Sequence, residues 1–330
     1  MRLGVLDVGS NTVHLLVVDA QRGGHPTPTH STKTALRLAE HVRDGRLDEE
    51  GADALVEAVA SARGQAEELG CEDVLAFATS AVRDASNSPA VLERVRTEAK
   101  VDLQVLSGSD EAALTFLAVR RWLGWSAGHL LVLDIGGGSL EMAVGRDEAP
   151  VHAISVPLGA GRLTRDWFTA DPPQRRELKS LAEYAHEVLA PAASTLLGEG
   201  PPDRAVVTSK TFRSLARLTG AAPRSAGPRV RRRLSAAGLR QVVAFISRMS
   251  STDLAELEGV SASRSHQLVA GAVVAHEAMT ALGLEEVEVC PWALREGIIL
   301  GRLDQLQPGG GMLSVGGPLA TGRPTLHEAR

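Results

Sequence analysis

A chain of 330 residues is longer than one hydrophobic core usually serves, so its length predicts two domains. Hydrophobic residues make up 44% and charged residues 23% of the chain, and no apolar run approaches the roughly 20 residues that a membrane-spanning helix needs. The net charge of −5 and the aromatic content of 3% argue against a general nucleic-acid binder, which needs basic surfaces and stacking rings. The composition therefore predicts a globular protein whose partners include neither a membrane nor a nucleic acid.

The first 19 residues are apolar enough to suggest a secretory signal peptide. Asp7, His14 and Asp19 interrupt this run, however, and no basic segment leads into it, so the pattern argues against a signal. We therefore expect a cytoplasmic protein. The two cysteines, Cys71 and Cys290, lie far apart and predict neither a zinc site nor a disulfide framework.

The first part of the chain alternates short apolar runs with amphipathic stretches. Apolar runs at 3–8 and 13–19 predict two strands joined by a hairpin turn. Residues 23–32, rich in Pro, Gly and Thr, are expected to form a connector. The elements expected next are a helix at 47–70, a strand at 74–82, a helix at 88–99 capped by Ser88 with Pro89 at its first position, a strand at 101–106 and a helix at 110–123.

The same pattern starts again after residue 124, where strands at 130–135 and 140–144 flank a second glycine-rich turn. The elements expected after it are a strand at 151–156, a helix at 175–197, a strand at 204–208, helices at 211–219, 235–249 and 263–282, a strand at 286–290 and a helix at 294–304. Residues 306–330 are rich in glycine and proline and have no periodicity, so we expect a disordered tail there.

The two turns form an internal repeat. The hexapeptide Asp-Val-Gly-Ser-Asn-Thr at 7–12 aligns with Asp-Ile-Gly-Gly-Gly-Ser at 134–139, and the offset of 127 residues places Asp7 on Asp134. Each copy begins a similar succession of strands and helices, which predicts a pair of related domains. The turns of such a pair would face each other across a cleft that can hold a ligand.

The residue types in these turns point to phosphate. Glycine lets the backbone approach a ligand closely, and successive N–H groups with Ser, Thr and Asn donors form a nest for anionic oxygens. The acids Asp7 and Asp134 would repel a bare phosphate but can hold a hydrated Mg²⁺ that bridges to it. One such turn is common in ordinary hairpins, whereas two copies in register favour phosphate binding. The expected phosphate-binding residues are Gly9, Ser10, Asn11, Thr12, Gly136, Gly137, Gly138 and Ser139.

Several segments, taken in order, resemble motifs of the Ppx/GppA phosphatase family, which contains exopolyphosphatases and guanosine pentaphosphate phosphohydrolases. These segments are the two turns, Ala-Thr-Ser-Ala-Val-Arg at 78–83, Ser-Gly-Ser-Asp-Glu-Ala at 107–112 and Ser-Lys-Thr-Phe-Arg at 209–213. The short chain is most similar to the two-domain exopolyphosphatases of actinobacteria. The resemblance implies an α/β fold with two actin-like, ribonuclease H-like domains of the sugar kinase, heat-shock chaperone and actin superfamily, separated by a cleft. The expected domains are 1–124 and 125–305, with the last helix packing back on the first.

The resemblance also implies roles for single residues. Glu111 would be the general base that activates water, although an acid in the first turn of a helix also simply complements the helix dipole. Arg83 would stabilise charge on the transferred phosphoryl group; a solvated surface arginine is the alternative. Asp7, Asp134 and Glu141 would hold Mg²⁺, with Mn²⁺ as the alternative metal, and Glu141 could otherwise be a solvent-facing strand residue.

Other positions depart from the family pattern or stay open. Ser209, Lys210 and Thr211 replace a glycine-threonine loop and are expected to bind phosphate or to cap the next helix. The basic run Arg231–Arg233 is either a solvated helix lead-in or a guide for a polyanion. We assign no role to His14 and none to the segment 263–267, which lacks the aspartate common in the family, and we interpret 295–297 as structural.

The expected activity is hydrolysis of the terminal phosphoanhydride of inorganic polyphosphate, with release of orthophosphate. Removal of the 5′-terminal phosphate of guanosine pentaphosphate is the alternative, which the scattered aromatic residues favour less because they supply no clear purine pocket. A kinase of the same superfamily and a non-catalytic nucleotide or alarmone sensor are less favoured. The family resemblance implies a homodimer as the assembly.

Overall fold

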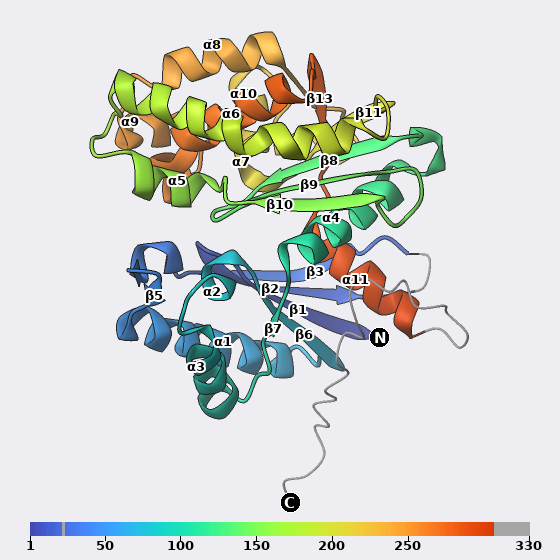
Figure 1. Cartoon of the computed structure of the whole chain (residues 1–330). Coiled ribbons are helices and arrows are strands. Elements are labelled where there is room, and N and C mark those ends of the chain that lie inside the picture. The colour runs from blue at the N-terminus through green and yellow to red at the C-terminus, as the bar shows by residue number, and fades with distance from the viewer. Residues whose placement is uncertain (22–23, 307–330) are drawn as a thin grey trace, which may run out of the picture.

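The computed structural model describes residues 1–21 and 24–306, so most of the expected disordered tail lies outside the described residues. Two β-sheets lie one above the other, and two helices, α4 (Gly108–Leu123) and α11 (Leu294–Gln305), lie between them (Figure 1). Each sheet has helices on its outer side, which bury the apolar residues of every second strand position.

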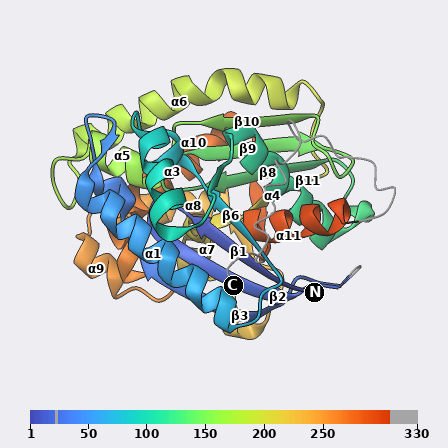
Figure 2. The same ribbon diagram turned by 90° about the horizontal axis from the view of Figure 1, so that it is seen from below.

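The first sheet has the strand order β3-β2-β1-β6-β7. Strands β1 and β2 and strands β2 and β3 pair antiparallel, whereas β1, β6 and β7 run parallel. Helices α1 and α3 cover the outer face of this sheet (Figure 2). The elements of this part are β1 (Arg2–Val8), β2 (Thr12–Asp19), β3 (Pro28–Ala35), a 3-10 turn (Leu38–His41), β4 (Val42–Arg43), β5 (Arg46–Leu47), α1 (Glu49–Glu68), β6 (Asp73–Ala78), α2 (Ser80–Arg83), α3 (Ser88–Arg94), a π-helical turn (Val95–Ala99) and β7 (Gln104–Val105).

The second sheet has the order β10-β9-β8-β11-β13-β12 and repeats the same pairing pattern, with β12 added antiparallel at its edge. Helix α10 is almost entirely apolar and buried from Leu268 to Ala275, because it lies at the centre of this half. The elements are β8 (Leu130–Ile135), β9 (Leu140–Gly145), β10 (His152–Val156), α5 (Ala160–Trp167), α6 (Arg175–Leu197), β11 (Arg204–Val207), α7 (Ser209–Leu218), β12 (Arg233–Ser235), α8 (Ala236–Ile246), α9 (Ser251–Ala255), α10 (Leu268–Ala281) and β13 (Glu286–Val289), with 3-10 turns at Trp125–Ala127, Arg224–Ala226 and Ala262–Gln267.

The internal repeat extends to single hydrogen bonds. The Gly9 N–H donates to the Thr12 carbonyl at 3.0 Å, and the Gly136 N–H donates to the Ser139 carbonyl at 2.9 Å. In both halves the first strand therefore turns into the second through the same backbone contact. The predicted repeat corresponds to two copies of one folding unit.

The two central helices are exchanged between the halves. Helix α4 follows the last strand of the first sheet, but its Phe116 and Val119 pack against Leu130 and Val132 of the second. Helix α11 follows the second sheet, but Ile298 and its neighbour pack against the first sheet. Burial of these apolar faces, at about 25 cal/mol per Å², holds the halves together.

Several element predictions were wrong. The supposed connector at 23–32 contains the start of β3, which was missed because it is an edge strand with neither face buried. The strand expected at 74–82 ends at Ala78, and Arg83 closes the short helix α2. The residue at the N-cap position of α3 is Asn87 rather than Ser88, its side chain bonds to the Leu47 backbone instead of the helix, and a π-helical turn follows the helix. The strand expected at 101–106 is confined to β7, and α5 and β12 were not expected.

Candidate active site

The two predicted phosphate loops touch each other at the centre of the molecule. A side chain on Gly137 would place its Cβ 2.9 Å from Ser10 Cβ, and one on Gly138 would lie 2.7 Å from Ser80 Cβ. Ser10 and Ser80 share a hydrogen bond of 3.1 Å between their hydroxyls. Glycine is therefore required at 137 and 138 for the close approach of the two halves, in addition to any contact with phosphate.

Strand alternation brings both loop acids to the inner faces of the sheets. Because side chains alternate along a strand, Asp7 points to the same face as Leu3 and Val5, which face α11. In the same way, Asp134 points to the same face as Leu130, which faces α4. Burial raises the pKa of both carboxyl groups. For Asp134 the Thr208 hydroxyl, which donates to it, opposes this shift and favours the charged form.

A row of side chains continues from Asp134 across the second sheet. Asp134 pairs with Glu141 on β9, and Glu141 pairs with Ser155 on β10, so the three residues share one face. The Ser155 hydroxyl donates to Glu141 at 3.0 Å. Glu141 is 6% exposed, so the alternative of a solvent-facing strand residue is wrong.

Glu111 faces this row from the first turn of α4. Ser107 caps the helix by accepting a hydrogen bond from the Asp110 N–H at 3.1 Å, and Gly108 packs directly on Ser155. Glu111 is 7% exposed. Burial and, secondly, the charge of Glu141 raise the pKa of Glu111, while the contact with Arg83 opposes the rise. Burial also raises the pKa of Glu141.

Arg83 connects Glu111 to the other half of the molecule. Its guanidinium donates to Glu111, to the Leu106 carbonyl at 3.1 Å and to Asp84 at 3.1 Å. Asp84 in turn accepts a hydrogen bond from Arg162 on α5. A continuous series of charged side chains therefore runs from Glu111 on α4 to Arg162 in the second half. Arg83 is part of this series, so the alternative of a solvated surface arginine is wrong.

A cavity of about 420 Å³ opens beside these groups. Arg83, the N-terminus of α4 at Gly108 and Ser109, and the second loop at Gly138 and Ser139 line it. Free N–H groups at a helix N-terminus, a guanidinium and a glycine loop are donors for phosphate oxygens. The cavity is therefore suited to a terminal phosphate. Two of its lining residues, Arg83 and Ser155, contact the buried carboxylates of Glu111 and Glu141.

The carboxylates of the cleft fit a metal that is shared with substrate. Among residues 1–21 and 24–306, no group of three His, Cys, Asp or Glu side chains could by itself hold a metal ion. Mg²⁺ usually keeps several waters and binds through one or two carboxylates and the phosphates of the substrate. The predicted ligands Asp7, Asp134 and Glu141 supply oxygen donors of that kind, and their role stays a prediction.

A second row, across the first sheet, was missed in the sequence. Asp7 pairs with His14 on β2, and His14 pairs with Lys33 on β3. Arg295, at the start of α11, contacts His14 and lies 3.7 Å from Asp7. Burial and, secondly, Arg295 lower the pKa of His14 to about 3, so the imidazole is neutral. Cross-strand register was the signal that could have connected His14 with Asp7.

Of the segment Ser209–Thr211, one side chain is turned into the protein. The Thr211 hydroxyl donates to the Ile135 carbonyl at 3.3 Å, which ties α7 to the strand before the second loop. Lys210 is exposed. Although the residue as a whole is exposed, partial burial of its amine and the positive charges of Arg264 and other neighbours lower the pKa of Lys210 to about 8.

The basic run at 231–233 is structural. Arg231 lies 3.7 Å from Glu288 and Arg233 lies 2.8 Å from Glu286, both on β13. The Arg232 guanidinium donates to four backbone carbonyls, those of Ala222, Pro223, Gly227 and Val230. These contacts fasten a loop to the sheet edge. Arg231 and Arg233 stay about half exposed (53% and 50% of their side chains), as a solvated segment would be, and the guiding role stays a prediction.

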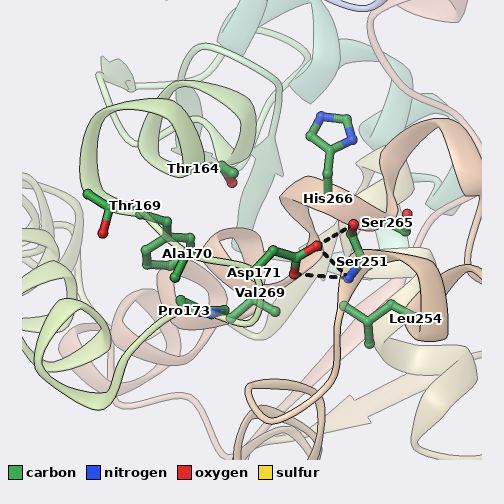
Figure 3. A pocket seen from close by; sticks show the side chains of 11 residues that line it. Thr164, Thr169, Ala170, Asp171, Pro173, Ser251, Leu254, Ser265, His266 and Val269 are labelled. Atoms are coloured by element: carbon green, nitrogen blue, oxygen red, sulfur yellow. Dashed lines mark hydrogen bonds between the residues drawn. The ribbon is translucent and has the colours of Figure 1, made fainter.

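A further cavity of about 280 Å³ lies in the second half, behind the 262–267 turn. Asp171 and Ser251 both line it, and Asp171 accepts hydrogen bonds from the Ser251 N–H at 3.0 Å and from the Ser251 hydroxyl at 2.5 Å (Figure 3). Ser265 and His266 of the turn line it. It contains none of the predicted site residues, and both cysteines also lie elsewhere, buried and free.

The paired sheets, the facing glycine loops and the buried acids define a two-lobed, actin-like phosphate-handling protein, as the sequence predicted. The chain belongs to the Ppx/GppA phosphatase family, whose sequence pattern matches residues 17–306. It is 63% identical to Exopolyphosphatase 1 of Mycobacterium tuberculosis over 305 residues, which cover 92% of this chain and 89% of the relative. Exopolyphosphatase 1 of Mycobacterium leprae is 60% identical, with 92% and 90% covered.

Solved structures agree with this fold. An exopolyphosphatase from Cytophaga hutchinsonii superposes with a TM-score of 0.83 at 25% identity and covers 93% of this chain and 99% of its own. The Ppx/GppA family member of Aquifex aeolicus superposes with a TM-score of 0.76 at 24% identity, with the same coverage. The predicted family and fold class are therefore confirmed. Within the described residues, no helix has the length and apolar character needed to cross a bilayer.

Proposed function

We propose that this protein is an exopolyphosphatase, which hydrolyses the terminal phosphoanhydride of inorganic polyphosphate and releases orthophosphate. The observation that carries the proposal is the buried Glu111, which contacts Arg83 where Arg83 and the second phosphate loop line a cavity. The high identity to two mycobacterial proteins named Exopolyphosphatase 1 supports it.

Glu111 is the general base of the proposed reaction. A water in the cavity transfers a proton to Glu111 while its oxygen bonds to the terminal phosphorus, and the bridging P–O bond breaks, leaving its electron pair on the shortened chain. Arg83, released from Glu111 as the phosphate enters, and the N–H groups of Gly138 and Ser139 stabilise the developing charge. One or two of the carboxylates of Asp7, Asp134 and Glu141 would hold Mg²⁺ or Mn²⁺ together with the substrate phosphates, where the ion would supply positive charge.

Orthophosphate release from polyphosphate and from guanosine pentaphosphate, with Mg²⁺ and after chelation, tests the proposal. We expect release from polyphosphate, loss after chelation, and a fall in kcat of about 10²- to 10⁴-fold in Glu111→Gln, because a positioned base contributes that much. The control is Asp110→Asn, which removes a neighbouring negative charge from the same helix turn. Equal kcat in wild type and Glu111→Gln would contradict the assigned base.

The same experiment separates the alternatives. Faster turnover of guanosine pentaphosphate would favour the phosphohydrolase, acceptor-dependent consumption of ATP a kinase, and binding without turnover a sensor. The proposal includes a cytoplasmic homodimer, for which sedimentation of the purified protein gives the assembly.

A further inference from the structure

The internal repeat extends beyond the two glycine loops to the strand that pairs in parallel with each first strand. Strand β6 is followed by Thr79 and Ser80, and β11 is followed by Thr208 and Ser209. The two threonines precede α2 and α7 with nearly the same backbone conformation, φ −115° and ψ −155° for Thr79 and φ −118° and ψ −148° for Thr208. They are therefore equivalent residues of the two halves.

The equivalent threonines lie at different positions along the neighbouring strand. The Thr79 N–H donates to the Val8 carbonyl at 3.1 Å, whereas the Thr208 N–H donates to the Leu133 carbonyl at 2.9 Å. The repeat offset of 127 residues places Val8 on Ile135, so Thr208 bonds two residues earlier on its neighbouring strand than Thr79 does. This difference decides what each threonine hydroxyl contacts.

In the second half, the difference places the threonine beside the loop acid. Because β8 and β11 pair in register up to Leu133, the next residues, Asp134 and Thr208, lie side by side, and the Thr208 hydroxyl donates to Asp134 Oδ2. In the first half, the Thr79 hydroxyl donates to the Val8 carbonyl at 3.4 Å instead. The loop acid of the first half receives no such bond from the residues that the structure describes.

Thr208 supplies a hydrogen bond that Asp134 would otherwise lack. Among residues 1–21 and 24–306, no other group donates a hydrogen bond to the Asp134 carboxylate, and no cationic side chain forms an ion pair with it. Asp7, by contrast, lies 3.7 Å from Arg295. Thr208 is itself fully buried, and a hydrogen bond to a carboxylate removed from water favours its charged form. The hydroxyl therefore stabilises the charge of Asp134.

The backbone directly after Thr208 adopts a strained conformation. Ser209 has a φ of 63°, in the left-handed region that residues with a side chain disfavour. The equivalent Ser80 begins an ordinary helical turn. The left-handed residue turns the chain from β11 into α7 at the level of Asp134. Strain of this kind persists where the surrounding structure fixes the residue in place, and it gathers at functional sites.

We propose that Thr208 is a positioning residue of the hydrolysis, which holds the charged Asp134 carboxylate in one orientation. This inference rests on the proposed function. The hydroxyl engages Oδ2, and Oδ1 accepts no hydrogen bond from any described residue, so Oδ1 stays available for a metal ion or for a water that the ion binds. Groups that orient a metal-binding carboxylate in this way contribute about 10- to 100-fold to metal affinity or activity.

A pair of substitutions separates the hydroxyl from the rest of the side chain. Thr208→Val keeps the shape and removes the hydroxyl, whereas Thr208→Ser keeps the hydroxyl and removes the methyl group. Thr79→Val makes the same deletion at the equivalent position, where the hydroxyl contacts a carbonyl rather than an acid. kcat, KM for polyphosphate and the Mg²⁺ concentration that gives half-maximal activity are measured for each variant.

We expect Thr208→Val to lower kcat about 10- to 100-fold and to raise the Mg²⁺ requirement, with little change in KM for polyphosphate. Thr208→Ser should recover most of the loss, because the donor returns. Thr79→Val should keep the Mg²⁺ requirement of the wild type. Crystal structures of the variants give a readout that does not depend on turnover: the Asp134 carboxylate should change its orientation in Thr208→Val and keep it in Thr208→Ser.

Several outcomes would overturn the inference. They are a wild-type kcat in Thr208→Val, an equal loss in Thr208→Ser, a loss confined to KM, an unchanged orientation of Asp134 in Thr208→Val, and an equal rise of the Mg²⁺ requirement in Thr79→Val. Where Thr208→Val does not fold, Thr208→Ala makes the same comparison with Thr208→Ser. A wild type that releases no orthophosphate from polyphosphate would overturn the proposed function, whereas the orientation of Asp134 would still test the contact.

Discussion

Glu111 is a carboxyl group whose surroundings disfavour its charge. Burial and the nearby Glu141 raise its pKa, and only the contact with Arg83 opposes them. A raised pKa makes Glu111 a stronger proton acceptor than an exposed glutamate, which is the property that a general base requires. The same surroundings leave more of it protonated, and therefore inactive, at low pH.

The pH profile of kcat/KM should follow from this. Only the deprotonated form of Glu111 accepts a proton, so we expect kcat/KM to rise as the pH increases through its raised pKa. Glu141→Gln removes the repelling charge and should move this rise to lower pH, whatever it does to the maximum rate. A rise at unchanged pH in the variant would contradict the coupling of the two acids.

Lys210 should show the opposite trend in binding. Its pKa is lowered to about 8, so the amine loses its charge as the pH rises above that value. We expect the affinity of Glu111→Gln for polyphosphate to fall between neutral and more alkaline pH, and to fall less when Lys210→Arg is added, because arginine keeps its charge. Calorimetric titration at several pH values measures both; identical pH dependence would argue against a contact between Lys210 and the chain.

A site residue could be predicted from the sequence when it lies in a short or repeated motif. It could not be predicted when its neighbours in the folded protein come from distant parts of the chain. The glycine loops and their aspartates were found because they repeat, and Glu111 because it stands within a short motif. Arg264 and Arg295 were not expected beside the loop aspartates, since each alone resembles an ordinary surface arginine. Only the folded chain brings them together from separate turns and helices.

Among the elements, α4 and α11 depend on a single close crossing. A Cβ on Gly297 would lie 2.6 Å from the Leu114 carbonyl carbon and closer still to its oxygen, whereas one on Gly301 would lie 3.7 Å from Leu114 Cδ2. Because α4 carries Glu111 at its start, this crossing also positions the proposed base.

Gly297→Ala and Gly301→Ala form a matched pair one helical turn apart. We expect Gly297→Ala to destabilise the protein by about 1–3 kcal/mol, since backbone atoms cannot make room for the added methyl group. Gly301→Ala should be neutral or stabilising by about 0.5–1 kcal/mol, because alanine favours the helix. Thermal unfolding of both variants measures the difference, and equal melting temperatures would contradict the tight crossing.

Strands were predicted correctly from the sequence where one face of the strand is buried, and they were missed where neither face is buried. The apolar runs of β1, β2 and β8 were recognised because each packs against helices. Strand β3 has no buried face, so its Ser and Thr residues looked like a connector. Helix α2 follows its strand so closely that the apolar pattern continues through it.

At the scale of the whole molecule, the Asp84–Arg162 pair joins the halves beside Arg83 and the proposed base Glu111. Asp84 also holds Arg83, so the separation of the lobes affects the orientation of that guanidinium. The pair is partly exposed, and its contribution to stability is therefore at most about 1 kcal/mol. Its main effect should be on turnover.

A double-mutant cycle tests this link. Asp84→Asn and Arg162→Gln should each lower kcat/KM a few fold, and the double variant should be little worse than either, because both remove one interaction. Arg146→Gln, which breaks an exposed pair with Asp203 within the second half, is the control and should have no effect. Fully additive losses would show that the two residues act independently.

The exchange of the central helices has a consequence for ancestry. Neither half of the chain supplies the central helix that packs on its own sheet. Helix α4 of the first half packs against the second sheet, and helix α11 of the second half packs against the first. A half-length ancestor would have needed a second copy of itself to supply the missing helix, and its two clefts would have been identical. Duplication and fusion of such a gene would remove that constraint, so that one half of the cleft could keep its acids while the other gained positive charge.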